Sequence, residues 1–432
     1  MSVSIPEHLP GEPRRGPPPA PVYALLLLLR AGAITLLAVF LGGLWLPFLL
    51  SLLVWGYPPN VPQPSQFWRY LGLTWRRAIP APGLSLLARL WITLSIARKL
   101  AVTPFWGLAW QLDLLLFGRR LAAVKVEAPL IEVSAARSGS TQIARYLEDD
   151  PGLVAPSFLQ IVFPYRWLWL LARPTIGRLL TPEVVRHKME QMLPLEFTQR
   201  HEGDPYRTDT FDGVLYISHL NNLAPFLGPD VLASDFGFAS PTPEAKALFE
   251  GAFVGLFDGV ARKILLEAGP GRRVFIKGHF LGAAQALARR YPDARFLTVI
   301  RSPGPRLQSA VNFLRANPVD DTLGPPPWAW LARGLEESET VYNRVEMDFF
   351  TRPGGPRRCV LRFTDFVTDL EGSMGRVYRE CLDQDTLPPH VPRAHPPRKR
   401  TDYLLNRSLA QLQIDEADLH AKQADYLTWC GG

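Results

Sequence analysis

Cysteine is scarce in this sequence, and the few residues present are far apart. The 432 residues contain only three, Cys359, Cys381 and Cys430. An odd number at this spacing offers neither a disulfide framework nor a Cys-x-x-Cys metal site. We therefore expect a reducing compartment for this part of the chain.

Long runs of basic residues are also missing. Lys and Arg outnumber Asp and Glu by 47 to 40, which gives a formal net charge of +7. Such an excess suits an anionic membrane surface, an anionic cofactor or nucleic acid. No run of five basic residues occurs, and no spacing is typical of an RRM, a helix-turn-helix or a zinc finger. Nucleic acid is therefore not the expected partner.

Charge is nearly absent from a long N-terminal segment. Residues 1–22 are rich in proline and show no apolar period, so we expect a disordered head. From Tyr23 to Tyr57 the only charged residue is Arg30. Ala31–Trp55 is long enough for the roughly 20 residues that cross a bilayer as a helix. The alternative is a buried soluble helix. A cleaved signal peptide is disfavoured, because the apolar region is too long and no small-x-small cleavage site follows it before Pro58-Pro59.

Basic residues and tryptophans alternate with leucine between residues 58 and 125. This pattern is typical of helices that lie in the headgroup region, and an ordinary helical subdomain is the alternative. The basic excess after the apolar segment predicts a cytoplasmic C-terminal part by the positive-inside rule. A re-entrant anchor with both ends inside would fit as well.

After Val126 short β-rich runs alternate with helical patterns, which predicts an α/β domain with a mainly parallel sheet. The expected strands are Leu130–Ala135, Arg273–Ile276, Arg295–Ile300 and Cys359–Phe363. The insert from residue 151 to 271 is expected to be largely helical.

The first expected strand runs into a turn of small residues, Arg137-Ser138-Gly139-Ser140-Thr141. Such a turn before a helix directs backbone N–H groups and the helix dipole at one point, where a phosphate binds. An ATP-binding Walker loop would need a glycine at Ser134 and a lysine at Ser140. The segment therefore predicts a phosphate site of another kind, or an ordinary turn.

Two more expected strands end in basic residues. Lys277 and His279 follow the second strand and point to the same side of an extended chain, where lysine could neutralise charge and histidine could remove a proton. Arg301 ends the third strand, and Ser309 lies in the next helix. These two side chains could converge on one anion.

Together these segments resemble the sulfotransferase superfamily, whose fold is P-loop-like. Arg137-Ser-Gly-Ser-Thr141 is similar to the 5'-phosphosulfate loop, Lys277-Gly-His279 to Lys-Thr-His, and the segment from Tyr291 to Ser309 to the 3'-phosphate motif. Gly278 and Ser302 depart from the usual threonine and aspartate. The resemblance covers about residues 126–429.

The resemblance implies a sulfotransferase that uses 3'-phosphoadenosine-5'-phosphosulfate without a metal, and the apolar N-terminal segment adds the expectation that it is attached to a membrane. Its acceptor would be a hydroxyl or amine of a lipid, glycolipid, carbohydrate or other small molecule. His279 would be the base, with Glu196 as the alternative, and Lys277 and Arg137 would stabilise charge. Three further residues would contact the nucleotide: Phe363, Arg398 and Lys399.

The expected division of the chain is a head at 1–22, a membrane anchor at 23–57, a membrane-associated helical region at 58–125 and the transferase domain at 126–432. A nucleotide-dependent, kinase-like transferase and an inactive membrane scaffold are the alternative functions.

Overall fold

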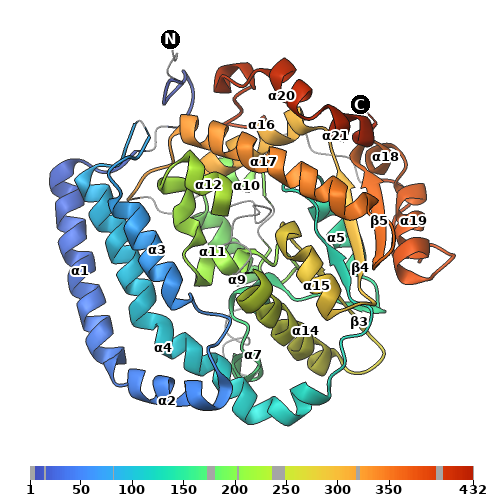
Figure 1. The fold of residues 1–432 in the computed structure, drawn as a ribbon, viewed down its shortest axis with the longest axis horizontal. Coiled ribbons are helices and arrows are strands. Elements are labelled where there is room, and N and C mark those ends of the chain that lie inside the picture. Colours follow the sequence, from blue (N-terminus) through green and yellow to red (C-terminus); the bar gives the residue numbers. More distant parts are fainter. Residues whose placement is uncertain are drawn as a thin grey trace.

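A five-stranded β-sheet lies in the right half of the molecule as drawn in Figure 1, away from the N-terminal helices on the left. Its strand order is β2-β3-β1-β4-β5, and every neighbouring pair is parallel. The strands are β1 (Leu130–Glu132), β2 (Leu153–Val154), β3 (Arg273–Lys277), β4 (Arg295–Ile300) and β5 (Arg357–Arg362). The computed structural model describes residues 5–13, 16–80, 82–172, 181–201, 204–235, 249–317, 322–395 and 402–431.

The helices fall into three groups along the chain. The N-terminal group is α1 (Ala20–Gly42), α2 (Trp45–Trp55), α3 (Pro64–Trp75) and α4 (Leu86–Ala123). From β1 to β3 the helices are α5 (Ser140–Leu147), α6 (Phe158–Val162), α7 (Arg166–Ala172), α9 (Pro182–Met192), α10 (Leu195–Thr198), α11 (Gly213–Ser218), α12 (Pro229–Asp235) and α14 (Val254–Ala268). After β3 they are α15 (Ala284–Arg290), α16 (Pro303–Ala316), α17 (Trp328–Thr351), α18 (Phe363–Thr368), α19 (Leu370–Leu382), α20 (Glu416–Lys422) and α21 (Ala424–Cys430).

Helices cover both faces of the sheet. In β4 every residue from Phe296 to Ile300 is buried, as is typical of parallel strands enclosed on two sides. Ile276 and Phe296 face a core shared with α14 and α17. Phe275 and Leu297 point the other way, into a core shared with α5 and α19. The molecule is therefore a three-layer α/β structure, as the sequence predicted.

The strand predictions are confirmed except at their ends. β1 stops at Glu132 instead of Ala135, because the chain there already turns toward the loop that precedes α5. Phe363 is the first residue of α18 and does not belong to β5. The two-residue strand β2 was not predicted.

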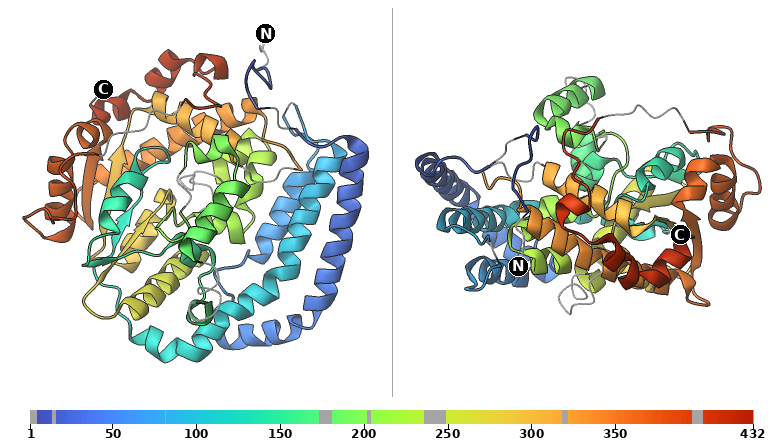
Figure 2. Two further views of the ribbon diagram at one scale, coloured as in Figure 1. Left: turned by 180° about the vertical axis from the view of Figure 1, so that it is seen from behind. Right: turned by 90° about the horizontal axis from the view of Figure 1, so that it is seen from above.

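The prediction of one continuous helix over Ala31–Trp55 is wrong. α1 ends at Gly42 and α2 starts at Trp45, with Gly43 and Leu44 in a turn between them. Two adjacent glycines favour this break, because glycine weakens a helix by roughly 1 kcal/mol relative to alanine. α1 lies beside α4, and α2 turns across toward the middle of that helix (Figures 1 and 2). By length and composition, α1 and α4 could each cross a membrane.

Part of the head that was predicted to be disordered makes specific contacts. Glu12 accepts hydrogen bonds from Nε and Nη2 of Arg407 at 2.8 and 2.7 Å. Glu7 pairs with Arg315 at 2.9 Å. Residues 5–13 therefore lie against the C-terminal part of the chain.

Candidate functional site

The three sequence motifs meet at the carboxyl ends of β1, β3 and β4. β1 is the central strand and pairs with β3 on one side and β4 on the other. The chain leaves β1 toward β2 and returns for β4 on the opposite side, so the strand order reverses at this point. Ligands of open α/β sheets bind at such a reversal.

The loop after β1 has the backbone of an anion site. Arg137 and Gly139 have φ angles of 68° and 95°, which is the left-handed region, and α5 begins at Ser140. A Cβ on Gly139 would lie 3.1 Å from the Phe363 ring, so the position also needs glycine for space. The Ser138 hydroxyl is buried and has no hydrogen-bond partner in the described part of the chain. An orphaned hydroxyl beside a helix N-terminus is a free donor for an anion.

Arg137, Ser309, Arg301 and Phe363 form one cluster beside this loop. Arg137 Nε donates to Ser309 Oγ at 3.0 Å, and Arg301 Nη1 donates to the Arg137 carbonyl at 2.7 Å. The Arg301 guanidinium lies 4.3 Å from the centre of the Phe363 ring. Burial lowers the pKa of Arg137 to about 10, and the nearby Arg200 adds to this shift. Arg137 is therefore a cation at neutral pH, and it lies beside Arg301 where a phosphate could bind.

Lys277 lies on the other side of the loop. Its Nζ donates to Thr141 Oγ1 at 3.1 Å and lies 3.6 Å from Asp209 Oδ1. The side chain is almost fully buried. Thus the lysine of the second motif contacts the last residue of the first.

His279 is held in one tautomer. Its Nδ1 lies 2.8 Å from the Ser134 carbonyl oxygen, which can only accept, so Nδ1 carries the proton and donates. In the neutral ring this leaves Nε2 with a lone pair. Burial lowers the pKa of His279, and the Lys277 ammonium adds to the shift although Asp212 opposes it. A neutral imidazole with a free Nε2 can act as a base.

Two carboxylates that the sequence did not identify complete the site. Asp212 Oδ1 accepts from the backbone N–H of His279 at 2.7 Å. Asp209 lies between Lys277 and His201, whose Nε2 is 2.9 Å from Asp209 Oδ2. Burial raises the pKa of Asp209, but the His201 hydrogen bond and the Lys277 charge outweigh it and lower the pKa overall. These residues precede β3 by more than sixty positions, so no local spacing links them to it.

A third carboxylate, Glu132, lies under the loop. Its Oε1 accepts from the backbone N–H of Ser134 at 3.0 Å and from the Ser134 hydroxyl. Burial raises the pKa of Glu132 to about 7, against the opposing effects of Ser134 and Lys277. Glu132 therefore supports Ser134, the residue whose carbonyl orients His279.

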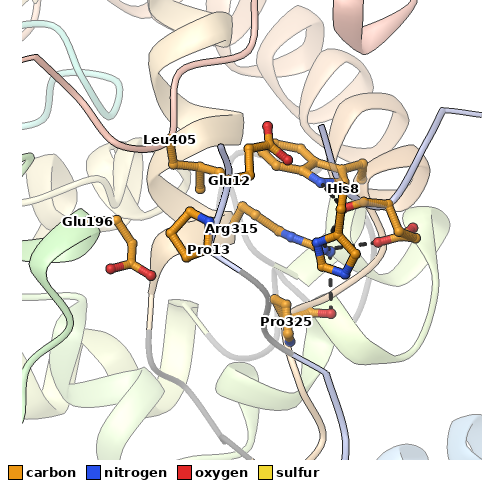
Figure 3. A pocket seen from close by; sticks show the side chains of 9 residues that line it. His8, Glu12, Pro13, Glu196, Arg315, Pro325 and Leu405 are labelled. Atoms are coloured by element: carbon orange, nitrogen blue, oxygen red, sulfur yellow. Dashed lines mark hydrogen bonds and ion pairs between the residues drawn. The ribbon is translucent and has the colours of Figure 1, made fainter. Parts of the chain in front are cut away.

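The remaining predicted residues lie elsewhere. Glu196 lines a small cleft with Pro13, Arg315 and Leu405, beneath the N-terminal head (Figure 3). None of the residues that line this cleft belongs to the phosphate loop or to the Lys277-His279 segment. Arg398 and Lys399 lie outside the described residues.

No protein-family model matches this chain, and no curated protein does. Two solved structures share its fold. The sulfotransferase STF9 from Mycobacterium avium has a TM-score of 0.58 and 17% identity, over 85% of this chain and 96% of that one. The sulfotransferase STF1 from Mycobacterium tuberculosis H37Rv has a TM-score of 0.53 and 17% identity, over 88% and 97%. Both matches cover a larger fraction of this chain than residues 126–432 alone represent. The structural similarity therefore extends into the first 125 residues.

Proposed function

We propose that the protein is a sulfotransferase. It would move a sulfuryl group from 3'-phosphoadenosine-5'-phosphosulfate to a hydroxyl or amine of its acceptor, with residues 126–432 as the transferase domain. The observation that carries this proposal is that three separate motifs converge at the carboxyl ends of the parallel strands. Lys277 contacts Thr141, and Arg137 contacts Ser309. Arg301 contacts the Arg137 carbonyl. A nucleotide with phosphates at both ends needs two anion sites at such strand ends.

Each of the two anion sites would bind one end of the donor. The loop from Arg137 to Thr141 would hold the 5'-phosphosulfate through backbone N–H groups and the Ser138 and Thr141 hydroxyls. Arg301 and Ser309 would hold the 3'-phosphate. Phe363 lacks the hydroxyl of a tyrosine, yet its ring beside Arg301 offers a surface for the adenine. The fold shared with two sulfotransferases supports this assignment.

The reaction would be a direct transfer. The acceptor oxygen or nitrogen attacks the sulfur, and its proton passes to Nε2 of His279. The bond between sulfur and the bridging oxygen breaks, and its electron pair stays on the phosphate of adenosine-3',5'-bisphosphate. Lys277 and Arg137 would stabilise the charge that grows on this oxygen. Asp209 would hold the Lys277 ammonium in place, and Ser134 the His279 ring.

Two alternative functions and one alternative base remain as candidates. A kinase-like transferase would place a lysine at Ser140 and would need a divalent metal. Glu196 is the alternative base, but the contacts of His279 with Ser134 and Asp212 favour the histidine. An inactive scaffold would bind the nucleotide without turnover.

The test is transfer of radioactive sulfur from the labelled donor to membranes of the source organism by the full-length protein. We expect label transfer in EDTA as well as in magnesium, because Lys277 and Arg137 supply the positive charge. His279→Ala should lower transfer on the order of 10²–10⁴-fold, which is typical for a general base. Glu196→Ala should retain it.

Loss of transfer in Glu196→Ala with near-normal transfer in His279→Ala would move the base to the carboxylate. A requirement for magnesium would favour the kinase-like alternative. Nucleotide binding without any transfer would indicate the scaffold.

A further inference from the structure

The helices α1 and α2 present a wide apolar surface at the edge of the molecule (Figure 1). Phe40 and Leu53 are each 84% exposed. Arg30, the only charge on either helix, turns inward: its Nη2 donates to Ser95 Oγ at 2.7 Å, and its guanidinium lies 3.9 Å from the Trp91 ring. Soluble monomers rarely expose so much contiguous apolar surface, and such patches mark interaction sites. The exposed large apolar residues are Val22, Leu25, Leu28, Leu29, Leu36, Val39, Phe40, Leu46, Leu49, Leu50, Leu53, Val54 and Trp55.

A narrow contact holds these two helices to α4. On α1 the buried residues, Tyr23, Leu27, Ile34 and Leu41, fall on one side. On α2, Phe48 packs against Gly107 of α4, where any side chain would clash with the ring. Ser51 Oγ also donates to Gln111 Oε1 at 2.5 Å. Most of the surface of both helices therefore faces away from the protein.

Both ends of the α1–α2 segment are attached to the same folded body. Before α1, Glu12 pairs with Arg407, which follows the transferase core. After α2, Asn60 Nδ2 donates to the Tyr165 hydroxyl at 2.9 Å and to the Trp106 carbonyl at 3.0 Å. Tyr165 belongs to the hydrophobic core between the sheet and α14. A single crossing would put these two attachments on opposite sides of a bilayer, so it is incompatible with the fold.

A second crossing within the segment is also excluded by length. α2 has 11 residues. At 1.5 Å per residue it is about 16 Å long, against roughly 30 Å of hydrocarbon. α4 is long enough to cross, but its second half carries Asp113, which pairs with Lys263 in the interior at 2.9 Å. That half of α4 is therefore part of the soluble core.

We infer that α1 and α2 form a monotopic membrane-binding edge, which inserts into one leaflet of a bilayer and does not cross it. This goes beyond the proposed reaction and does not depend on it. Of the two anchors expected from the sequence, this edge is of the re-entrant kind with both ends on one side, instead of the single span over Ala31–Trp55. It would keep the whole transferase domain on one side of the membrane. Such insertion removes the exposed leucine and phenylalanine side chains from water.

Charge favours a lipid bilayer over a second copy of the chain as the occupant. Residues 20–123 contain nine basic residues and a single acidic one, Asp113. Arg69 and Arg76 pair with Asp235 and Asp230. The basic residues left exposed beside the edge, Arg77, Arg98, Arg119 and Arg120, are complemented by anionic headgroups. Trp55 and Trp75 are exposed at the ends of α2 and α3, and Trp68 is exposed within α3. Tryptophan is enriched at the level of the headgroups.

Flotation with lipid vesicles tests whether the exposed apolar residues of α1 and α2 bind a membrane. Full-length protein is mixed with vesicles of phosphatidylcholine and phosphatidylglycerol, alongside the double variant Phe40→Asp/Leu53→Asp. The matched control is Met192→Asp on α9, because Met192 is 83% exposed and lies outside the edge. We expect wild type and Met192→Asp to float, and the ratio of bound to free double variant to fall roughly tenfold or more. Both altered side chains are exposed, so the variant should keep its fold, which circular dichroism checks.

Equal flotation of the double variant and the wild type would overturn the inference. So would a lipid-free wild-type dimer that the double variant converts to a monomer while wild type fails to float. The second result would identify another copy of the chain as the occupant.

Labelling of cysteines distinguishes an edge from a span. His8→Cys lies before α1 and Arg77→Cys lies after α2, and both positions are exposed. The wild type provides the background, because its three cysteines are buried. An impermeant maleimide should label both variants in inverted membrane vesicles and neither in right-side-out vesicles, or the reverse if the domain is outside. Labelling of one variant in each preparation would show a crossing and overturn the inference.

Discussion

At the scale of single residues, the contact between His279 and Ser134 determines what the imidazole can do. A carbonyl oxygen accepts only, so Nδ1 keeps its proton and Nε2 is left as the acceptor. Asp212 holds the backbone of the same residue at 2.7 Å. Gly278 allows this approach, since a Cβ there would lie 2.5 Å from Asp212 Oδ1. The space around Gly278 therefore leaves no room for a side chain.

The lowered pKa of His279 predicts a particular pH dependence. An ordinary histidine titrates near pH 6.5. Burial and Lys277 lower the pKa of His279, so its neutral form persists as the pH falls through 6.5. Transfer should therefore be lost only at lower pH, where the ring gains a proton. The acid limb of the pH profile of kcat/KM for the donor, measured at saturating acceptor, should have its midpoint below pH 6.5.

A midpoint at or above 6.5 would contradict this account of the histidine. His279→Ala provides the control, because its residual rate should no longer follow that limb. An unchanged limb in the variant would assign the titration to another group.

At the scale of elements, α4 is fixed by a charge inside the protein. Asp113 accepts from the backbone N–H groups of Arg166 and Trp167 at 2.7 and 2.9 Å, and it pairs with Lys263 of α14. Lys263 also lies 3.4 Å from the centre of the Trp110 ring. The Asp113–Lys263 pair therefore joins α4 of the N-terminal group to α14, which packs on one face of the sheet.

Removal of the lysine should therefore destabilise the whole chain. Lys263→Met leaves Asp113 charged and buried, which typically costs about 3–5 kcal/mol. Lys422→Met is the matched control, because Lys422 forms exposed pairs with Glu336 and Asp418. A surface pair is worth about 0–1 kcal/mol. Urea denaturation should show a large fall of the midpoint for Lys263→Met and a small one for Lys422→Met; equal midpoints would mean that the buried pair does not hold α4.

The sequence predicted the strands well and the N-terminal helices poorly, for a physical reason. β3 and β4 are mainly apolar, and a basic residue stands at the end of β3 (Lys277) and directly after β4 (Arg301), which is a local pattern. The adjacent glycines Gly42 and Gly43 weaken the helix locally, but the direction in which α2 then packs across α4 is set by tertiary contacts, which no local pattern contains. β2 has only two residues and is defined by its pairing with β3.

The same distinction separates the site residues. Arg137, Lys277, His279 and Arg301 follow strands, so their convergence could be predicted from the parallel sheet. Asp209 comes from the helical insert and is brought beside Lys277 by tertiary packing alone.

At the scale of the whole molecule, the two ends of the chain meet. Glu12 pairs with Arg407 and Glu7 with Arg315, and both arginines stack on Trp328, at 4.1 and 4.9 Å from its ring centre. Arg407 and Arg315 are both buried. Residues 5–13 therefore belong to the folded body. Their contacts hold the start of α1 beside the C-terminal part of the chain.

The central claim is that a bisphosphorylated nucleotide binds at the carboxyl ends of β1, β3 and β4, and calorimetric titration tests it most directly. Adenosine-3',5'-bisphosphate is titrated into the full chain, into Arg301→Ala and into Arg333→Ala, an exposed arginine of α17. A charge-assisted contact is worth about 1.5–3 kcal/mol, so Arg301→Ala should weaken binding roughly ten- to a hundredfold. Arg333→Ala should bind like wild type, and ATP with magnesium should bind more weakly than the bisphosphate. Tighter binding of ATP with magnesium, or equal affinities in the two arginine variants, would contradict the account.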